Sequence, residues 1–134
     1  YDKYDNLSHY RIDRISNIEI LDTPRKPKKQ VEGLVGLDVA KYMQEHIFMF
    51  GGKSIRAKFE MPKYLISDVL DSFGANVNFT DIGDGNVLTS VKVNENDIRY
   101  WARLYASQIK ITEPKELVDM CKQDMVNALK LYDV

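Results

Sequence analysis

From residue 53 onward the hydrophobic positions follow two regular periods, which predicts short strands alternating with amphipathic helices. In residues 54–60 every second side chain is apolar, as in a strand with one buried face. Between Pro62 and Gly74 the apolar side chains recur at helical spacing, as in a helix that begins at a proline and ends before a glycine. The rest of the chain predicts, in order, strands at 76–80 and 87–93 around a glycine-rich hairpin loop, a helix capped by Asn94, a strand at 108–111 and a C-terminal helix starting at Thr112 and Pro114.

This order of elements predicts an α+β domain. Its first six elements form the βαββαβ arrangement of ferredoxin-like folds, and the last helix is an addition to it. The apolar stripe of that helix comprises Leu117, Cys121, Met125, Ala128 and Tyr132. We therefore expect Cys121 to be a small buried hydrophobe and not a nucleophile.

Period-two counting places basic side chains on the sheet face opposite the helices. Arg56 and Lys58 come from the first strand, Lys92 from the third and Lys110 from the fourth, and only Glu60 opposes them. This candidate anion-binding face has no outward aromatic side chain on its central strands, because Phe59 has the inward parity, so base stacking is disfavoured. A plain solvated sheet face is the alternative.

The N-terminal third is less regular. Residues 9–21 are rich in β-branched side chains and predict a strand, with a bulge near Asp13 and Arg14 where Ile15 breaks the alternation. Arg11 and Asp13 share a face, so we expect them to pair. Arg14 falls on the apolar parity and needs an anionic partner, either a protein carboxylate or a ligand. Residues 22–30 are expected to be a solvated connector, and Asp38 is expected to cap a helix that runs to about residue 46.

Composition narrows the function classes. The 134 residues carry 19 basic and 20 acidic side chains, a net charge of -1, which does not predict a protein that coats nucleic acid. The single cysteine and the lack of an apolar run of membrane length or a signal sequence predict a cytoplasmic protein that does not contact membranes. No pairing of catalytic acid and base or cluster of metal ligands is apparent, so we expect neither an enzyme nor a cofactor or metal. Because the first residue is tyrosine, we expect the chain to be part of a longer protein.

Several stretches together resemble one family. Residues 10–15, Tyr-Arg-Ile-Asp-Arg-Ile, followed by Ser-Asn-Ile-Glu-Ile, resemble the closing strand motif of WYL domains. Downstream, Asp38-Val-Ala-Lys-Tyr, Phe48-Met-Phe-Gly-Gly, Asp71-Ser-Phe-Gly, Trp101 and Ile109-Lys-Ile-Thr-Glu-Pro-Lys-Glu-Leu are similar to the C-terminal extension that accompanies those domains. The resemblance covers nearly the whole chain. It implies a bacterial transcription regulator with an N-terminal winged helix-turn-helix, a WYL domain built on a small Sm-like or SH3-like β-barrel, and this extension.

The resemblance also implies a division of the chain. Residues 1–36 would be the end of the WYL domain, contributing one or two remnant strands and a helix of its barrel, residues 37–52 a connecting helix and loop, and residues 53–134 the ferredoxin-like extension. The Trp-Tyr-Leu signature and the DNA-binding helices are absent, so DNA would be bound through an N-terminal domain that this chain lacks.

The extension would help to form homodimers and relay effector occupancy. Arg11, Asp13 and Arg14 would contact an anionic effector, such as a nucleotide or single-stranded nucleic acid. Two other functions remain open. One is a stand-alone module that binds anions or nucleic acid on the face of Arg56, Lys58, Lys92 and Lys110, and the other is a purely structural dimerisation domain.

Overall fold

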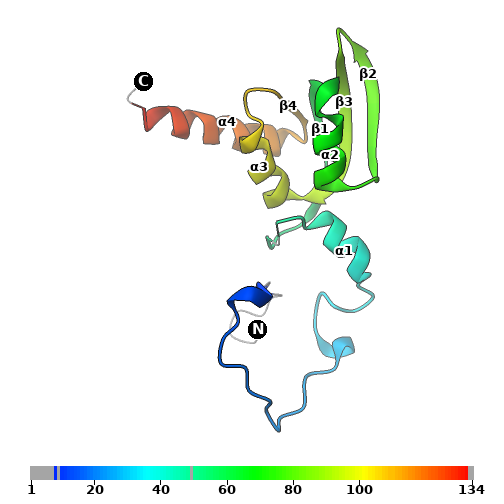
Figure 1. Ribbon diagram of the computed structural model, residues 1–134, viewed down its shortest axis with the longest axis vertical. Coiled ribbons are helices and arrows are strands. Elements are labelled where there is room, and N and C mark those ends of the chain that lie inside the picture. The colour runs from blue at the N-terminus through cyan, green and yellow to red at the C-terminus, as the bar shows by residue number, and fades with distance from the viewer. Residues whose placement is uncertain (1–7, 9, 49, 133–134) are drawn as a thin grey trace.

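The computed structural model describes residue 8 and residues 10–48 and 50–132, and it has an α+β architecture (Figure 1). Four strands form one antiparallel sheet in the order β2-β3-β1-β4. The elements in chain order are α1 (Val39–Glu45), β1 (Ser54–Pro62), α2 (Ile66–Phe73), β2 (Val77–Gly83), β3 (Asn86–Asn94), α3 (Glu95–Leu104), β4 (Lys110–Glu113) and α4 (Lys115–Lys130), with single 3-10 turns at Ile12–Arg14, Lys28–Gln30 and Lys63–Leu65.

The connections between strands follow the predicted order. Helix α2 joins β1 to β2, and β3 lies between those two strands; helix α3 joins β3 to β4, and β1 lies between them. Strands β2 and β3 meet in a tight hairpin in which Asp84 and Gly85 both have positive φ, the geometry that matches the twist of paired strands. Each strand begins within two residues of its predicted start. The topology is compatible with a ferredoxin-like fold.

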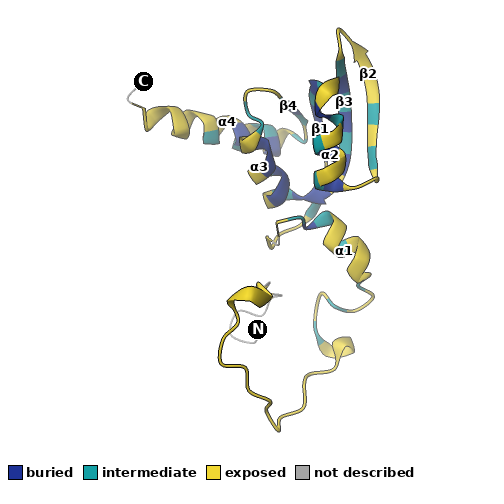
Figure 2. Cartoon of the chain, in the orientation of Figure 1, coloured by how far each residue is buried: buried dark blue, intermediate teal, exposed yellow. Residues whose placement is uncertain are grey.

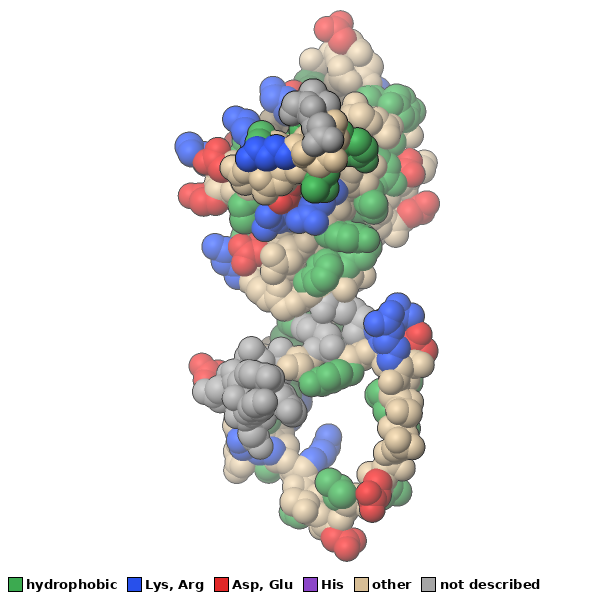
Figure 3. Space-filling view, turned by 90° about the vertical axis from the view of Figure 1, so that its left-hand side faces the viewer, with side chains coloured by type: hydrophobic (Ala, Val, Ile, Leu, Met, Phe, Trp, Pro, Cys, Tyr) green, Lys and Arg blue, Asp and Glu red, His purple; other side chains and the backbone are tan. Residues whose placement is uncertain are grey.

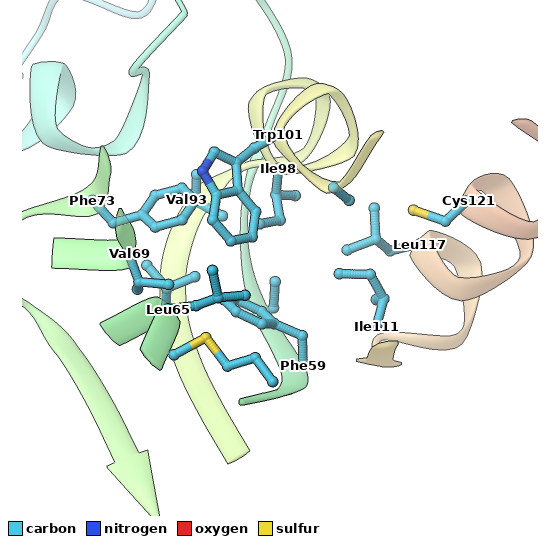
Figure 4. Close-up of a cluster of buried hydrophobic side chains, with 14 of the residues drawn as sticks. Phe59, Leu65, Val69, Phe73, Val93, Ile98, Trp101, Ile111, Leu117 and Cys121 are labelled. Atoms are coloured by element: carbon cyan, nitrogen blue, oxygen red, sulfur yellow. The ribbon is translucent and has the colours of Figure 1, made fainter. Parts of the chain in front are cut away.

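The core lies between the sheet and helices α2, α3 and α4. The inward parity predicted for β1 is confirmed, since Ala57 and Phe59 are fully buried. Trp101 of α3 packs at the centre, with its ring centroid 5.4 Å from that of Phe59 and 5.0 Å from that of Phe73 (Figure 4). Its indole nitrogen donates a hydrogen bond of 3.0 Å to the Ser72 hydroxyl. Figure 2 shows buried residues concentrated on β1, β3 and α3.

The strand predicted at residues 9–21 is wrong for the described part of that segment. Residues 10–37 contain no strand, and Ile12–Arg14 form a 3-10 turn instead. The apolar side chains that suggested a buried face are in water, with Ile12 86% and Ile20 95% exposed. A strand is stabilised by pairing with a neighbouring strand, and residues 10–37 pair with no strand formed by the described residues. The predicted remnant barrel strands are therefore not formed within residues 10–36, and the rest of that prediction, at residues 1–7 and 9, lies outside the described residues.

Helix α4 extends beyond the core. Leu117 and Cys121 are buried as predicted, but Met125, Ala128 and Tyr132 of the same stripe are exposed. The C-terminal half of α4 projects from the rest of the molecule (Figure 1). None of the helices formed by the described residues is long and apolar enough to cross a membrane.

Candidate functional site

Arg11, Asp13 and Arg14 lie together in one exposed turn. The guanidinium of Arg11 donates from Nη2 and Nε to the two carboxylate oxygens of Asp13, at 2.6 and 3.0 Å, which confirms the predicted pairing. This contact lowers the pKa of Asp13. Arg14 does not point into an interior, contrary to the parity argument, because the turn leaves its side chain exposed. Arg11 is therefore already paired with a carboxylate, whereas the exposed Arg14 side chain has no carboxylate partner among the described residues.

The basic face of the sheet carries more carboxylates than predicted. Lys110 lies 3.5 Å from Glu60, as its parity allowed. Lys58 pairs with Glu113 at 3.0 Å, and Lys92 pairs with Glu45 at 3.2 Å. The expectation that Glu60 alone opposes four cations is wrong.

Two details account for these extra carboxylates. Strand β4 extends two residues beyond its predicted end, which brings in Glu113. Helix α1 docks on the sheet and brings in Glu45. An extended track of unpaired cations, which a polyanion needs, is thus absent among the described residues.

The fourth cation of this face lines a polar cavity of about 370 Å³ between α1 and the sheet. The Arg56 side chain forms no hydrogen bond or ion pair with another described residue, although its backbone belongs to the β1–β3 ladder. Two residues that line the cavity are joined to each other, because the Asn76 side-chain amide donates to the Gln44 oxygen at 3.1 Å. The remaining lining residues are Lys41, Glu45, Phe73, Ala75, Val77, Asn78 and Lys92.

A buried polar junction at the start of α3 connects the sheet domain to residues 46–53. Asp97 is fully buried, and its Oδ2 accepts the Phe48 backbone N–H at 3.2 Å. Burial raises the pKa of Asp97, and the backbone N–H groups of Phe48, Phe50 and Ile47 together with the His46 charge offset part of that rise.

Two further hydrogen bonds close the junction. The Asn96 side chain donates to the Gly51 carbonyl at 2.7 Å, and the Glu95 N–H donates to the Lys53 carbonyl at 3.0 Å. We did not predict this junction, because an aspartate in the first turn of a capped helix is normally a surface residue that favours the helix dipole.

An apolar groove of about 460 Å³ lies between α3 and the projecting half of α4. Its apolar wall consists of Ala102, Ala106, Cys121, Met125, Ala128 and Leu131. Figure 3 looks toward the C-terminal end of α4 and shows hydrophobic side chains gathered beside it.

Asp124 lies at one rim of the groove and forms ion pairs with two arginines of α3. Its carboxylate accepts from Arg99 at 2.6 Å and lies 3.1 Å from Arg103. Arg99 first, and then Arg103, lower the pKa of Asp124. Burial raises the pKa of the Cys121 thiol, as expected of a structural cysteine.

Comparison with protein-family models and with curated proteins finds no match to this chain.

Proposed function

We propose that this chain is the effector-sensing and oligomerisation portion of a bacterial transcription regulator of the WYL type. Residues 53–134 would be its ferredoxin-like extension, and DNA would be bound by a winged helix-turn-helix outside this chain. The observation that carries the proposal is the apolar groove between α3 and α4 together with the exposed end of α4. Two further features support the proposal: the order of the family-like motifs along the sequence, and a strand order that is compatible with the proposed fold.

The projecting half of α4 supports self-association. Helices of this length gain most of their stability from tertiary packing, and only the first two turns of α4 pack on the core. The exposed apolar stripe of α4 forms one wall of the apolar groove, so the two make a single apolar surface. In a two-fold dimer this surface of each copy would cover the same surface of the other.

The polar junction supports a relay from the N-terminal segment to this surface. Asp97 binds the Phe48 amide from α3, and Arg99 and Arg103 of the same helix hold Asp124 of α4. A displacement of residues 46–53 would therefore act on α3 directly and on α4 through two ion pairs. The side chain that would respond to an anionic effector is Arg14, since Arg11 is engaged by Asp13.

Sedimentation equilibrium of the chain over a wide concentration range tests self-association. Met125 lines the groove and is 45% exposed, whereas Val126 is 47% exposed and does not line it. We expect a concentration-dependent dimer that Met125→Glu abolishes and Val126→Glu retains. A monomer at every concentration, or equal effects of the two variants, contradicts the proposal.

The sensing role is tested in the full-length protein. Arg14→Ala should weaken the transcriptional response to the effector and leave operator binding without effector unchanged. Asp22→Ala, which removes another exposed charge of the same segment, is the control. A response that survives Arg14→Ala unchanged refutes the role of Arg14.

A further inference from the structure

The two central strands place two cations directly opposite each other. In the β1–β3 register Arg56 pairs with Lys92, and both side chains lie on the face away from the core. Side chains opposite each other on antiparallel strands lie close together, and like charges in that arrangement are destabilising. An anion held close to both side chains would relieve this repulsion.

The carboxylate that the protein supplies compensates only one of the two. Glu45 of α1 lies 3.2 Å from Lys92, and its carboxylate also accepts a hydrogen bond from the Ser54 hydroxyl. These contacts hold Glu45 on the Lys92 side. Arg56 has no carboxylate partner among the described residues.

The cavity beside this pair has the charge and the donors of an anion site. Lys41, Arg56 and Lys92 line it against the single carboxylate of Glu45, an excess of two positive charges. The side-chain amide of Asn78 adds a neutral donor on the same wall. At about 370 Å³ the cavity can hold a small organic molecule, and α1 contributes Lys41, Gln44 and Glu45 to its wall.

We propose that this cavity binds the phosphate group of a small phosphomonoester. A phosphomonoester carries a charge of about -1.5 to -2 at pH 7, which matches the excess charge of the cavity. Its terminal oxygens can accept two parallel hydrogen bonds from the planar guanidinium of Arg56, and the ammonium groups of Lys41 and Lys92 act as point charges beside it. A monocarboxylate would neutralise only half of the excess.

This site is independent of the proposed function. It lies between α1 and the sheet, and the dimer surface lies between α3 and α4, so either can fail without the other.

The test is an NMR titration of the uniformly ¹⁵N-labelled chain with glycerol 3-phosphate at constant ionic strength. We expect saturable shifts confined to residues 41–45, 54–58, 76–78 and 90–92. Arg56→Gln should weaken binding at least tenfold, the size expected for losing a charge-assisted hydrogen bond. This variant also removes one of two facing like charges, so it is expected to fold, and a wild-type spectrum away from the cavity verifies this.

Lys110→Gln is the matched control, because Lys110 is a cation of the same sheet face outside the cavity. It should change the affinity less than twofold. Inorganic phosphate and succinate form two further arms. Weaker binding of inorganic phosphate than of glycerol 3-phosphate supports a phosphomonoester, whereas equal binding assigns the site to free phosphate and overturns the ester assignment.

Other results overturn the site as well. One is that glycerol 3-phosphate produces no saturable shift, and another is that succinate binds as tightly as the phosphate compounds. Equal losses of affinity in the Arg56 and Lys110 variants would also overturn it. A single-stranded oligonucleotide that binds more tightly than glycerol 3-phosphate, with shifts extending to Lys58 and Lys110, also overturns it.

Discussion

The helix cap of α3 offers the sharpest test of the packing described above. Asn94 is fully buried, and its Oδ1 accepts the backbone N–H groups of Asn96 at 2.9 Å and Asp97 at 3.1 Å. Replacing Asn94 by alanine leaves both donors without their acceptor. Water can reach the Asn96 N–H, but the Asp97 N–H is buried, so its full desolvation cost remains.

The magnitude follows from these two donors. Loss of an N-cap costs about 0.5–2 kcal/mol, and a buried donor left unpaired costs about 1–3 kcal/mol. Because the two figures describe partly the same loss, we expect the Asn94→Ala variant to lose about 2 kcal/mol of unfolding free energy. With an m value of roughly 2 kcal/mol per molar, that loss lowers the urea midpoint by about 1 M.

Asn94→Ser is the matched control. Serine keeps an oxygen acceptor at the cap and removes the Asn94 side-chain NH2, which has no hydrogen-bond partner among the described residues. Its stability should therefore stay within about 0.5 kcal/mol of the wild type. Urea unfolding followed by the fluorescence of Trp101, the only tryptophan, measures both variants. An alanine variant as stable as the serine variant would refute the role of Oδ1 as the cap.

Three further predictions follow from the same contacts. Burial raises the pKa of Asp97 in the folded state, so its protonated form contributes stability that is lost as the pH rises from the unfolded pKa, about 4, through the raised folded pKa. Urea titrations should therefore show that the unfolding free energy of the wild type, minus that of Asp97→Asn, falls across this pH window. A difference that rises with pH contradicts this reasoning. Gly85 has a φ of +74° with open space at the Cβ position, so a side chain there would meet backbone strain and no clash. Thermal unfolding should show that Gly85→Ala loses about 1–2 kcal/mol of unfolding free energy and that Gly85→Asn loses clearly less. Equal losses in the two variants would exclude a conformational cause. Arg99→Gln should raise the pKa of Asp124 toward its ordinary range in carboxyl ¹³C NMR, whereas Lys115→Gln should leave it unchanged; an unmoved pKa refutes Arg99 as its main cause.

The local pattern predicts the elements of the sheet domain because each of them directs one face toward the core, although β2 is only half-buried there. Residues 54–60 alternate since one face of β1 covers the core, and the alternation alone gives Phe59 the inward parity that disfavours base stacking. The cap at Asn94 is also evident from the sequence, because a cap acts on donors two and three residues away. Errors at strand ends are small: β4 begins and ends two residues later than predicted.

The same pattern fails where the partner surface is not local. Residues 10–21 have the composition of a strand, but pairing with another strand is what makes one, and in this structure they form a turn and exposed coil. The apolar stripe of α4 is predicted correctly as a pattern, yet periodicity cannot tell whether the core reaches its end, and the structure leaves Met125 and Tyr132 uncovered.

For the basic face of the sheet, the sequence determined which cations share the face, and the tertiary structure decided which of these cations are paired with carboxylates. Parity placed Arg56, Lys58, Lys92 and Lys110 together, since side chains of a strand alternate with a fixed period. Only the docking of α1 and the extension of β4 showed that Glu45 and Glu113 claim two of these cations, and only the register set Arg56 opposite Lys92. Ion pairing depends on distances of a few ångströms between elements far apart in the chain, and no local pattern contains them.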